Sequence, residues 1–235
     1  MNNLNKKAFT LIEIIIAISI MSLIFYVAYR AVTQIGFAKA EIEDQRDTLQ
    51  IANTILTRFA RELQLVSDYQ QLEDPSLEGY YFFGSDERIS GDRDGDQITF
   101  LAEDGGQYVP DGQTHSGLVM ISYRVVRNPE RTKSGAEETF VLIRDEVPNT
   151  KPYEKALEKR MTFPITDKLV SLNFEFFDHS ARSWQNDWKE KFQDKAINKV
   201  PGMIRIKIRI MTNSGKIMTF ATAIAIKAGV KFGRT

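Results

Sequence analysis

Residues 6–29 read KKAFTLIEIIIAISIMSLIFYVAY, and this stretch decides how the rest of the chain is interpreted. From Phe9 to Tyr29 it contains a single charged residue, Glu13. At about 1.5 Å rise per residue, a helix of this length reaches about 31 Å, which is enough to span the hydrocarbon core of a bilayer. The sequence therefore predicts a transmembrane helix at residues 9–30.

The charges beside this segment predict its orientation. Lys6 and Lys7 precede it and no acidic residue does, so the positive-inside rule places the first residues in the cytoplasm. The bulk of the chain then lies across the membrane, in the periplasm of a bacterium. A secretory signal peptide fits less well, because the apolar stretch is long and no small-x-small cleavage site with a polar start follows it. A buried core helix also fits less well, because no other apolar segment is long enough to surround it.

Glu13 is the informative residue of the segment. An unpaired carboxylate inside an apolar span costs about 2.5–3.5 kcal/mol on the insertion scale, so such a residue is usually paired and functional. The alternative is that Glu13 reaches the near membrane interface, since it lies only six residues after Lys7.

The run from Lys6 to Glu13 closely resembles the class III signal of type IV pilins and type II secretion pseudopilins. The resemblance implies that a prepilin peptidase cuts between Ala8 and Phe9 on the cytoplasmic side and N-methylates the new terminus. The family usually has Gly before the cut, where this chain has the small residue Ala8. In a filament, the new amine of Phe9 would pair with Glu13 of a neighbouring subunit, which relieves the cost of burying both charges.

The helical pattern continues beyond the apolar segment. Seam positions recur at spacings of three and four, with the charged residues, Glu62 among them, off the seam. We expect one helix from about Phe9 to Val66. Its second half, Leu49–Val66, is predicted to pack on the protein's own sheet and its first half to contact partner helices, a continuous coiled coil being the alternative. The seam consists of Ile35, Ala38, Ile42, Gln45, Leu49, Ala52, Leu56, Phe59, Leu63 and Val66.

After Val66 the sequence predicts an antiparallel sheet. The final predicted hairpin joins an alternating strand, Ile204–Ile210, to Lys216–Lys227 through a turn at residues 213–215. A polar connection is expected at Pro148–Pro164. The predicted fold class is therefore α+β, a pilin-like fold with a long N-terminal helix packed on an antiparallel sheet. The earlier predicted strands are Tyr80–Phe83, Gln97–Ala102, Leu118–Arg127, Thr139–Glu146 and Leu169–Asp178.

The composition excludes several classes of function. The 31 basic and 31 acidic residues give zero formal net charge, which argues against a nucleic-acid binder that relies on a basic surface. The absence of cysteine excludes disulfides, cysteine-ligated metals and thiol nucleophiles. The sequence has no G-x-S-x-G, Walker or G-x-G-x-x-G motif. We therefore expect neither an enzyme nor a cofactor site.

An acidic run resembles a calcium loop in part. Asp92, Asp94 and Asp96 alternate, and Glu103 falls at the twelfth position. The glycine, however, is at the fourth position rather than the sixth. A tight turn is the simpler interpretation.

The histidines and tryptophans are the remaining candidates. His115 and His179 are predicted to be solvated loop residues, because neither lies in a metal-binding or catalytic pattern. Trp184 and Trp188 are four residues apart, within one turn if their segment is helical. They could form a partner surface or cap the core of the sheet, and the sequence favours neither.

The chain as a whole most resembles the minor pseudopilin J family of type II secretion. The resemblance implies assembly with minor pseudopilins I and K and the major pseudopilin, in a pseudopilus tip that primes assembly and supports protein export. A minor pilin of a type IV pilus or DNA-uptake machine is the alternative, and a membrane-tethered enzyme or sensor is a second. The resemblance rests on Ala28-Tyr29-Arg30-Ala31, Leu56, Arg61-Glu62-Leu63, Phe174–Asp178, Trp184, Trp188, Pro201 and the basic strand with Arg205, Lys207 and Arg209.

These expectations divide the chain into four parts. Residues 1–8 form a cleaved leader, and residues 9–30 form the transmembrane helix of a single-pass protein in the bacterial inner membrane. Residues 31–66 continue that helix into the periplasm, and residues 67–235 form a β-rich globular domain there.

Overall fold

The computed structural model describes residues 10–66, 82–91, 93–103, 117–128, 138–148, 158–179, 181–189 and 200–227. The chain divides into two compact units, Met1–Arg46 and Asp47–Thr235. The first consists of the N-terminal part of a long helix, and the second combines the end of that helix with a β-sheet.

The helix α1 runs from Leu11 to Gln64 without interruption. This confirms the prediction of one helix, and Gly36 lies within it without a break. Phe9, the predicted first residue, lies outside the described residues. The stretch has no proline and a single glycine, and these are the two residue types that disfavour a helix most.

The predicted antiparallel sheet is confirmed. Nine of the described strands form one sheet in the order β11-β10-β7-β6-β5-β4-β1-β9, with β8 paired to β7, and every paired strand is antiparallel. The strands are β1 (Phe82–Ser85), β2 (Arg88–Ser90), β3 (Arg93–Asp94), β4 (Gln97–Glu103), β5 (Leu118–Arg127), β6 (Phe140–Pro148), β7 (Met161–Asp178), β8 (Ser183–Gln185), β9 (Trp188–Lys189), β10 (Met203–Met211) and β11 (Ile217–Ala225).

One long strand, β7, makes the sheet curl. Its first part, Met161–Leu169, pairs with β6, and its second part, Leu169–Phe177, pairs with β10. The register shifts at two places between β6 and β7, and such bulges bend and twist a strand. The prediction of a polar connection through Pro164 was therefore wrong at both ends, because Pro148 ends β6 and Met161 already begins β7. Residues 149–157 of that connection lie outside the described part.

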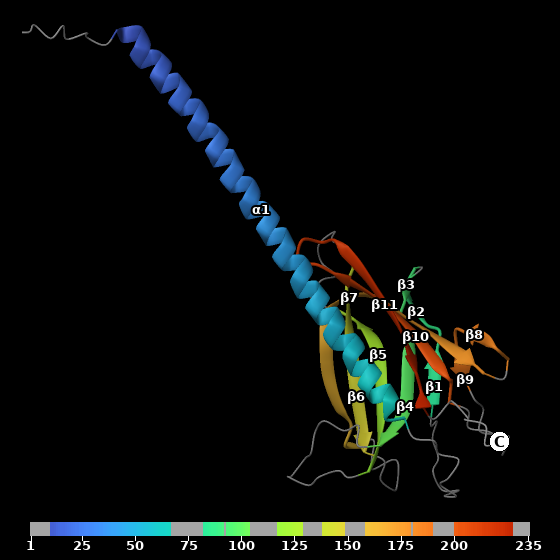
Figure 1. The fold of residues 1–235 in the computed structure, drawn as a ribbon. Coiled ribbons are helices and arrows are strands. Elements are labelled where there is room, and N and C mark those ends of the chain that lie inside the picture. Colours follow the sequence, from blue (N-terminus) through green and yellow to red (C-terminus); the bar gives the residue numbers. More distant parts are fainter. Residues whose placement is uncertain are drawn as a thin grey trace, which may run out of the picture. The chain divides into compact units, whose positions relative to one another are not determined.

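The core of the second unit lies between the sheet and the last turns of α1, which cross β4, β5 and β6 in Figure 1. Phe59 of α1 is fully buried, and its ring centroid lies 4.2 Å from that of Tyr123 and 5.6 Å from that of Phe174. Ala52, Leu63 and Val66 are buried in the same cluster, so packing of this part of the helix on the sheet is confirmed.

The predicted seam was wrong in phase at four positions. Leu49 is 45% exposed, whereas Thr48 and Ile55 are buried. Glu62, which we placed off the seam, is only 1% exposed. A straight α-helix drifts about 20° per heptad from a strict seven-residue repeat, and a sheet covers a wider helix face than one partner helix does.

Candidate functional site

The N-terminus of α1 is closed by a reciprocal pair of residues, Thr10 and Glu13. The backbone N–H of Glu13 donates to the Thr10 hydroxyl at 3.3 Å, and the backbone N–H of Thr10 donates to Glu13 Oε2 at 2.9 Å. The Thr10 hydroxyl also donates to the same carboxylate oxygen at 3.0 Å. Thr10 is thus the N-cap and Glu13 the third helical residue of a capping box, which satisfies two otherwise unpaired backbone donors.

Glu13 therefore has a role within its own chain that the sequence reasoning missed. The T-x-x-E spacing before an apolar run was the available signal. All of its capping contacts use Oε2, and no described residue donates a hydrogen bond to Oε1. The carboxylate consequently keeps one acceptor oxygen for a partner from outside the chain. Ala8 and Phe9, the predicted cleavage residues, lie outside the described part.

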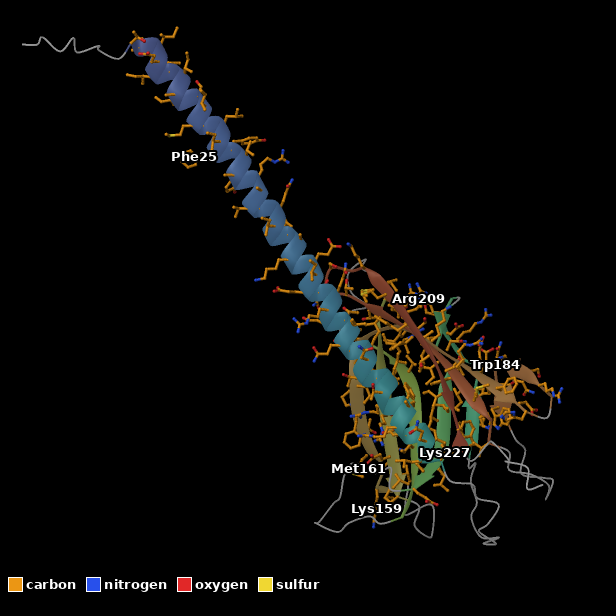
Figure 2. All side chains as sticks on the ribbon, viewed as in Figure 1. Phe25, Lys159, Met161, Trp184, Arg209 and Lys227 are labelled. Carbon is orange, nitrogen blue, oxygen red and sulfur yellow. The ribbon has the colours of Figure 1, made fainter. Side chains whose placement is uncertain are left out.

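The side chains of the apolar half of α1 are exposed in this single chain. Leu11 and Phe37 are each 78% exposed and Phe25 is 68% exposed. Figure 2 shows side chains, Phe25 among them, projecting from this part of the helix on all sides. Within the described residues, α1 is the one helix long and apolar enough to cross a membrane, by length and composition. A helix that is apolar all round is stable only in lipid or among other apolar helices.

Comparison with known families finds the prokaryotic N-terminal methylation motif at residues 3–29. The motif and the long apolar helix indicate a type IV pilin-like protein. A search of curated proteins finds no match.

The pilin-like assignment has direct consequences. The motif implies processing by a prepilin peptidase and assembly with other pilin-like proteins. Pilin-like proteins with this motif are structural rather than enzymatic. The apolar helix near the N-terminus is consistent with membrane anchoring. The long helix and the curled antiparallel sheet together give a pilin-like α+β architecture.

The pilin-like helix is fixed to its sheet by a buried charged cluster, Glu62–Arg144–Glu146 with Tyr123. Arg144 Nε of β6 donates to Glu62 Oε1 at 3.0 Å, Arg144 Nη1 donates to Glu146, and the Tyr123 hydroxyl of β5 donates to Glu62 Oε2 at 2.6 Å. Arg144 is fully buried and both carboxylates are 1% exposed. The cluster therefore joins α1, β5 and β6 through charges that have been removed from water.

The electrostatics of this cluster favour the charged forms on which it depends. Burial lowers the pKa of Arg144, but the carboxylates of Glu62 and Glu146 outweigh this effect, and the net pKa lies above its ordinary value. Burial and the adjacent Glu62 carboxylate raise the pKa of the Tyr123 hydroxyl, which stays protonated and donates. Sequence reasoning missed the cluster, although strand alternation places Arg144 on the same face as Phe140 and Leu142.

The acidic run has a structural use at Asp96. This fully buried carboxylate accepts the backbone N–H of Phe174 at 2.7 Å and that of Glu87 at 3.2 Å, and so joins the residue just before β2 to β7. Burial raises the pKa of Asp96 to about 7, against the lowering effect of these two amides. Among the described residues, no group of three His, Asp or Glu could hold a metal. Asp92 lies outside the described part, and Glu103 is exposed.

The histidines and tryptophans are now partly placed. His179 is exposed, as predicted, and its ring packs against Gly202, where an added Cβ would lie 2.0 Å from the imidazole. His115 lies outside the described residues. Trp184 and Trp188 lie on the short strands β8 and β9 rather than on a helix. Trp188 is 6% exposed within the core cluster, so it caps the core, whereas Trp184 is half-buried beneath the guanidinium of Arg205.

Proposed function

We propose that this protein is a minor pseudopilin of a type II secretion system. After cleavage between Ala8 and Phe9 it remains in the bacterial inner membrane through residues 9–30, with its N-terminus cytoplasmic and residues 67–235 periplasmic. It joins minor pseudopilins I and K and the major pseudopilin at the pseudopilus tip, which primes assembly and supports export across the outer membrane. The resemblance of the later sequence to the J family supports the choice of secretion over pili.

The observation that carries the proposal is the capping box at the start of a bare apolar helix. Glu13 Oε2 holds the helix start, while Oε1 accepts from no described residue. The new amine of Phe9 on a neighbouring subunit is a cation of the kind that Oε1 can accept from. The cap and the intersubunit pair are therefore compatible, and one carboxylate can serve both.

Two substitutions separate these roles. Glu13→Gln keeps the capping box, because Gln also serves at the third helical position, but it removes the charge. Thr10→Val removes the capping hydroxyl and keeps the charge, at a cost of about 0.5–2 kcal/mol in helix stability. We expect Glu13→Gln to be cleaved and N-methylated but not incorporated into filaments, and Thr10→Val to be incorporated at a reduced level.

The measurements are the mass of the mature N-terminal peptide and the share of the protein in sheared filaments. Glu43→Gln is the control, because it neutralises an exposed carboxylate farther along α1 that pairs with Lys39 at 3.7 Å. Normal incorporation of Glu13→Gln would show that the charge of Glu13 has no part in assembly.

Deletion of the gene separates secretion from piliation. We expect loss of export of folded periplasmic proteins with intact pili. Intact secretion with lost pili would instead identify a minor pilin.

Orientation is tested with a single cysteine, since the chain has none of its own. Lys227 is exposed, so Lys227→Cys offers an accessible thiol. We expect a membrane-impermeant maleimide to label it once the outer membrane alone is permeabilised. Labelling only after lysis of the inner membrane would reverse the proposed orientation.

A further inference from the structure

The strand β11 forms one edge of the sheet. It stands at the end of the strand order, and its described pairing is to β10 alone (Figure 1). The strand at the opposite end, β9, has only two residues, whereas β11 has nine. Among the described strands, the two ends of the strand order are therefore one short edge and one long edge.

Alternate residues of β11 direct their backbone groups away from the sheet. The Thr212 N–H donates to the Lys216 carbonyl at 2.8 Å, and the Ile226 N–H donates to the Gly202 carbonyl at 3.0 Å. In an antiparallel ladder every second residue bonds to the neighbouring strand. These two bonds therefore show that the even-numbered residues of β11 bond to β10 and that the odd-numbered residues do not. The residues that direct their N–H and C=O groups outward are Ile217, Thr219, Ala221, Ala223 and Ala225.

This edge lacks the features that normally block strand addition. Its sequence IMTFATAIA has no charged residue and no proline, whereas natural edges usually carry such residues. Met161–Lys168 of β7 also pairs on one side only, and it contains Pro164, Asp167 and Lys168. Thr219, Ala221, Ala223 and Ala225 are all exposed and small, so the outward backbone groups of β11 remain accessible.

A basic stripe lies beside this edge, on the next strand. In register, Lys207 stands opposite Ala221 and Arg209 opposite Thr219, and Figure 2 labels Arg209 near this part of the sheet. Arg205 is already paired with Glu175 and stacks 4.3 Å from the centroid of Trp184. Lys207 and Arg209 make no ion pair with any residue that the structure describes.

The geometry lets these two cations reach an added strand. Strands are spaced by about 4.8 Å, so a strand added to β11 would lie about 9.6 Å from β10. The small side chains of Thr219 and Ala221 leave the intervening surface open to the long side chains of Lys207 and Arg209. Acidic side chains at alternate positions of the added strand would meet them there. A second copy fits poorly, because self-pairing would place two identical basic stripes on one sheet face.

We propose that the outer edge of β11 binds an extended segment of another protein that carries acidic residues at alternate positions. Backbone hydrogen bonds to the edge supply affinity, and Lys207 and Arg209 supply the charge preference. This surface does not depend on the secretory role proposed above.

The test uses the full chain in detergent micelles and a labelled peptide, Thr-Glu-Val-Glu-Val-Glu-Thr, with fluorescence anisotropy as the readout. Ala221→Pro removes one outward N–H without touching the ladder to β10, and we expect it to weaken binding about tenfold. Ala221→Thr, which keeps the N–H, should bind nearly as the original does. Backbone N-methylation of alternate peptide residues should abolish binding, whatever the stability of the protein variants.

The charge preference has its own controls. Lys207→Gln with Arg209→Gln should weaken binding about fivefold and reduce its salt dependence. Lys159→Gln changes an exposed cation on another part of the domain and should leave binding unchanged. Equal binding of the lysine counterpart of the peptide would overturn the proposal, as would full binding by Ala221→Pro. Self-association that Ala221→Pro abolishes, without any peptide binding, would show that the occupant is a second copy.

Discussion

Replacement of Arg144 by methionine removes the one cation from the buried cluster that joins α1 to the sheet. The guanidinium bonds to Glu62 at 3.0 Å and to Glu146, and its side chain is fully buried. Methionine fills a similar volume without charge. Arg144→Met therefore leaves two buried carboxylates without the cation that offsets their burial, at the interface between helix and strand.

The expected loss of stability is large. Removing one member of a buried ion pair costs about 3–5 kcal/mol, and the loss of a cation shared by two carboxylates belongs at the upper end of this range. Domains are typically stable by about 5–15 kcal/mol, so a third or more of the stability disappears. With a urea slope of about 1–3 kcal/mol per M, the unfolding midpoint falls by more than about 1 M.

Arg124→Met is the matched control. Arg124 lies on the neighbouring strand and bonds to Asp145 at 2.7 Å, but its side chain is 34% exposed. Its partner Asp145 is only 5% exposed but also accepts from the Thr162 hydroxyl at 2.6 Å, so the loss of Arg124 should cost about 1–3 kcal/mol, less than the loss of Arg144. The two substitutions are chemically identical and differ mainly in the burial of the charge that they remove.

The assay is urea unfolding followed by the fluorescence of Trp184 and Trp188, both of which lie in the sheet unit. A double-mutant cycle completes it. Glu62→Gln removes one of the two stranded charges, so the double variant with Arg144→Met should lose less than the sum of the single losses, by at least about 1 kcal/mol. Equal losses for Arg144→Met and Arg124→Met, or strict additivity in the cycle, would refute the reasoning.

Three further predictions concern the sheet unit. The raised pKa of Asp96 favours its protonated form in the folded state, so its contribution is greatest below about pH 4 and is lost as pH rises toward about 7. A difference of about 3 in pKa corresponds to about 4 kcal/mol, so relative to Asp96→Asn the original protein should lose up to about 4 kcal/mol across that window in urea titrations. Gly84→Ala should strongly lower the melting temperature measured by calorimetry, because the new Cβ would lie 2.1 Å from a core phenylalanine ring. Gly117→Ala is the control, because its Cβ would meet no atom within 4 Å, and it should leave the melting temperature unchanged. Trp188→Ala should cost about 3–5 kcal/mol and Trp184→Ala clearly less, because only the former is in the core.

The helix and most strands followed from patterns that a single sequence carries. The strand Leu118–Arg127 was predicted with its observed bounds, and the alternation of Ile204–Ile210 placed β10 correctly. Local periodicity decides these elements, since burial on one face demands it. The start of β7 at Met161 was missed because Pro164, Asp167 and Lys168 argue locally against a strand, and pairing with β6 outweighs them.

The buried charges could not be predicted in the same way. Glu62 and Arg144 are 82 positions apart in the chain, and their pairing depends on which helix face meets which strand. Asp96 and Phe174 are 78 positions apart in the chain. The donor to the carboxylate is a backbone amide, which every residue except proline has, so no residue type in the sequence indicates it. An error of about 20–40° in the phase of the helix was enough to place Glu62 in solvent.

Two of the carboxylates of α1, Glu13 and Glu62, show why one helix can serve two purposes. Near its start, Glu13 caps the helix and keeps an oxygen for an outside cation, in a stretch whose apolar side chains have no partners among the described residues. Near its end, Glu62 uses both oxygens on Arg144 and Tyr123 of its own domain. A carboxylate whose two oxygens both accept hydrogen bonds within the chain stabilises the fold. A carboxylate with one unused oxygen, beside exposed apolar side chains, is suited to bind a neighbouring subunit. The helix therefore completes its own domain at one end and requires other subunits or lipid at the other.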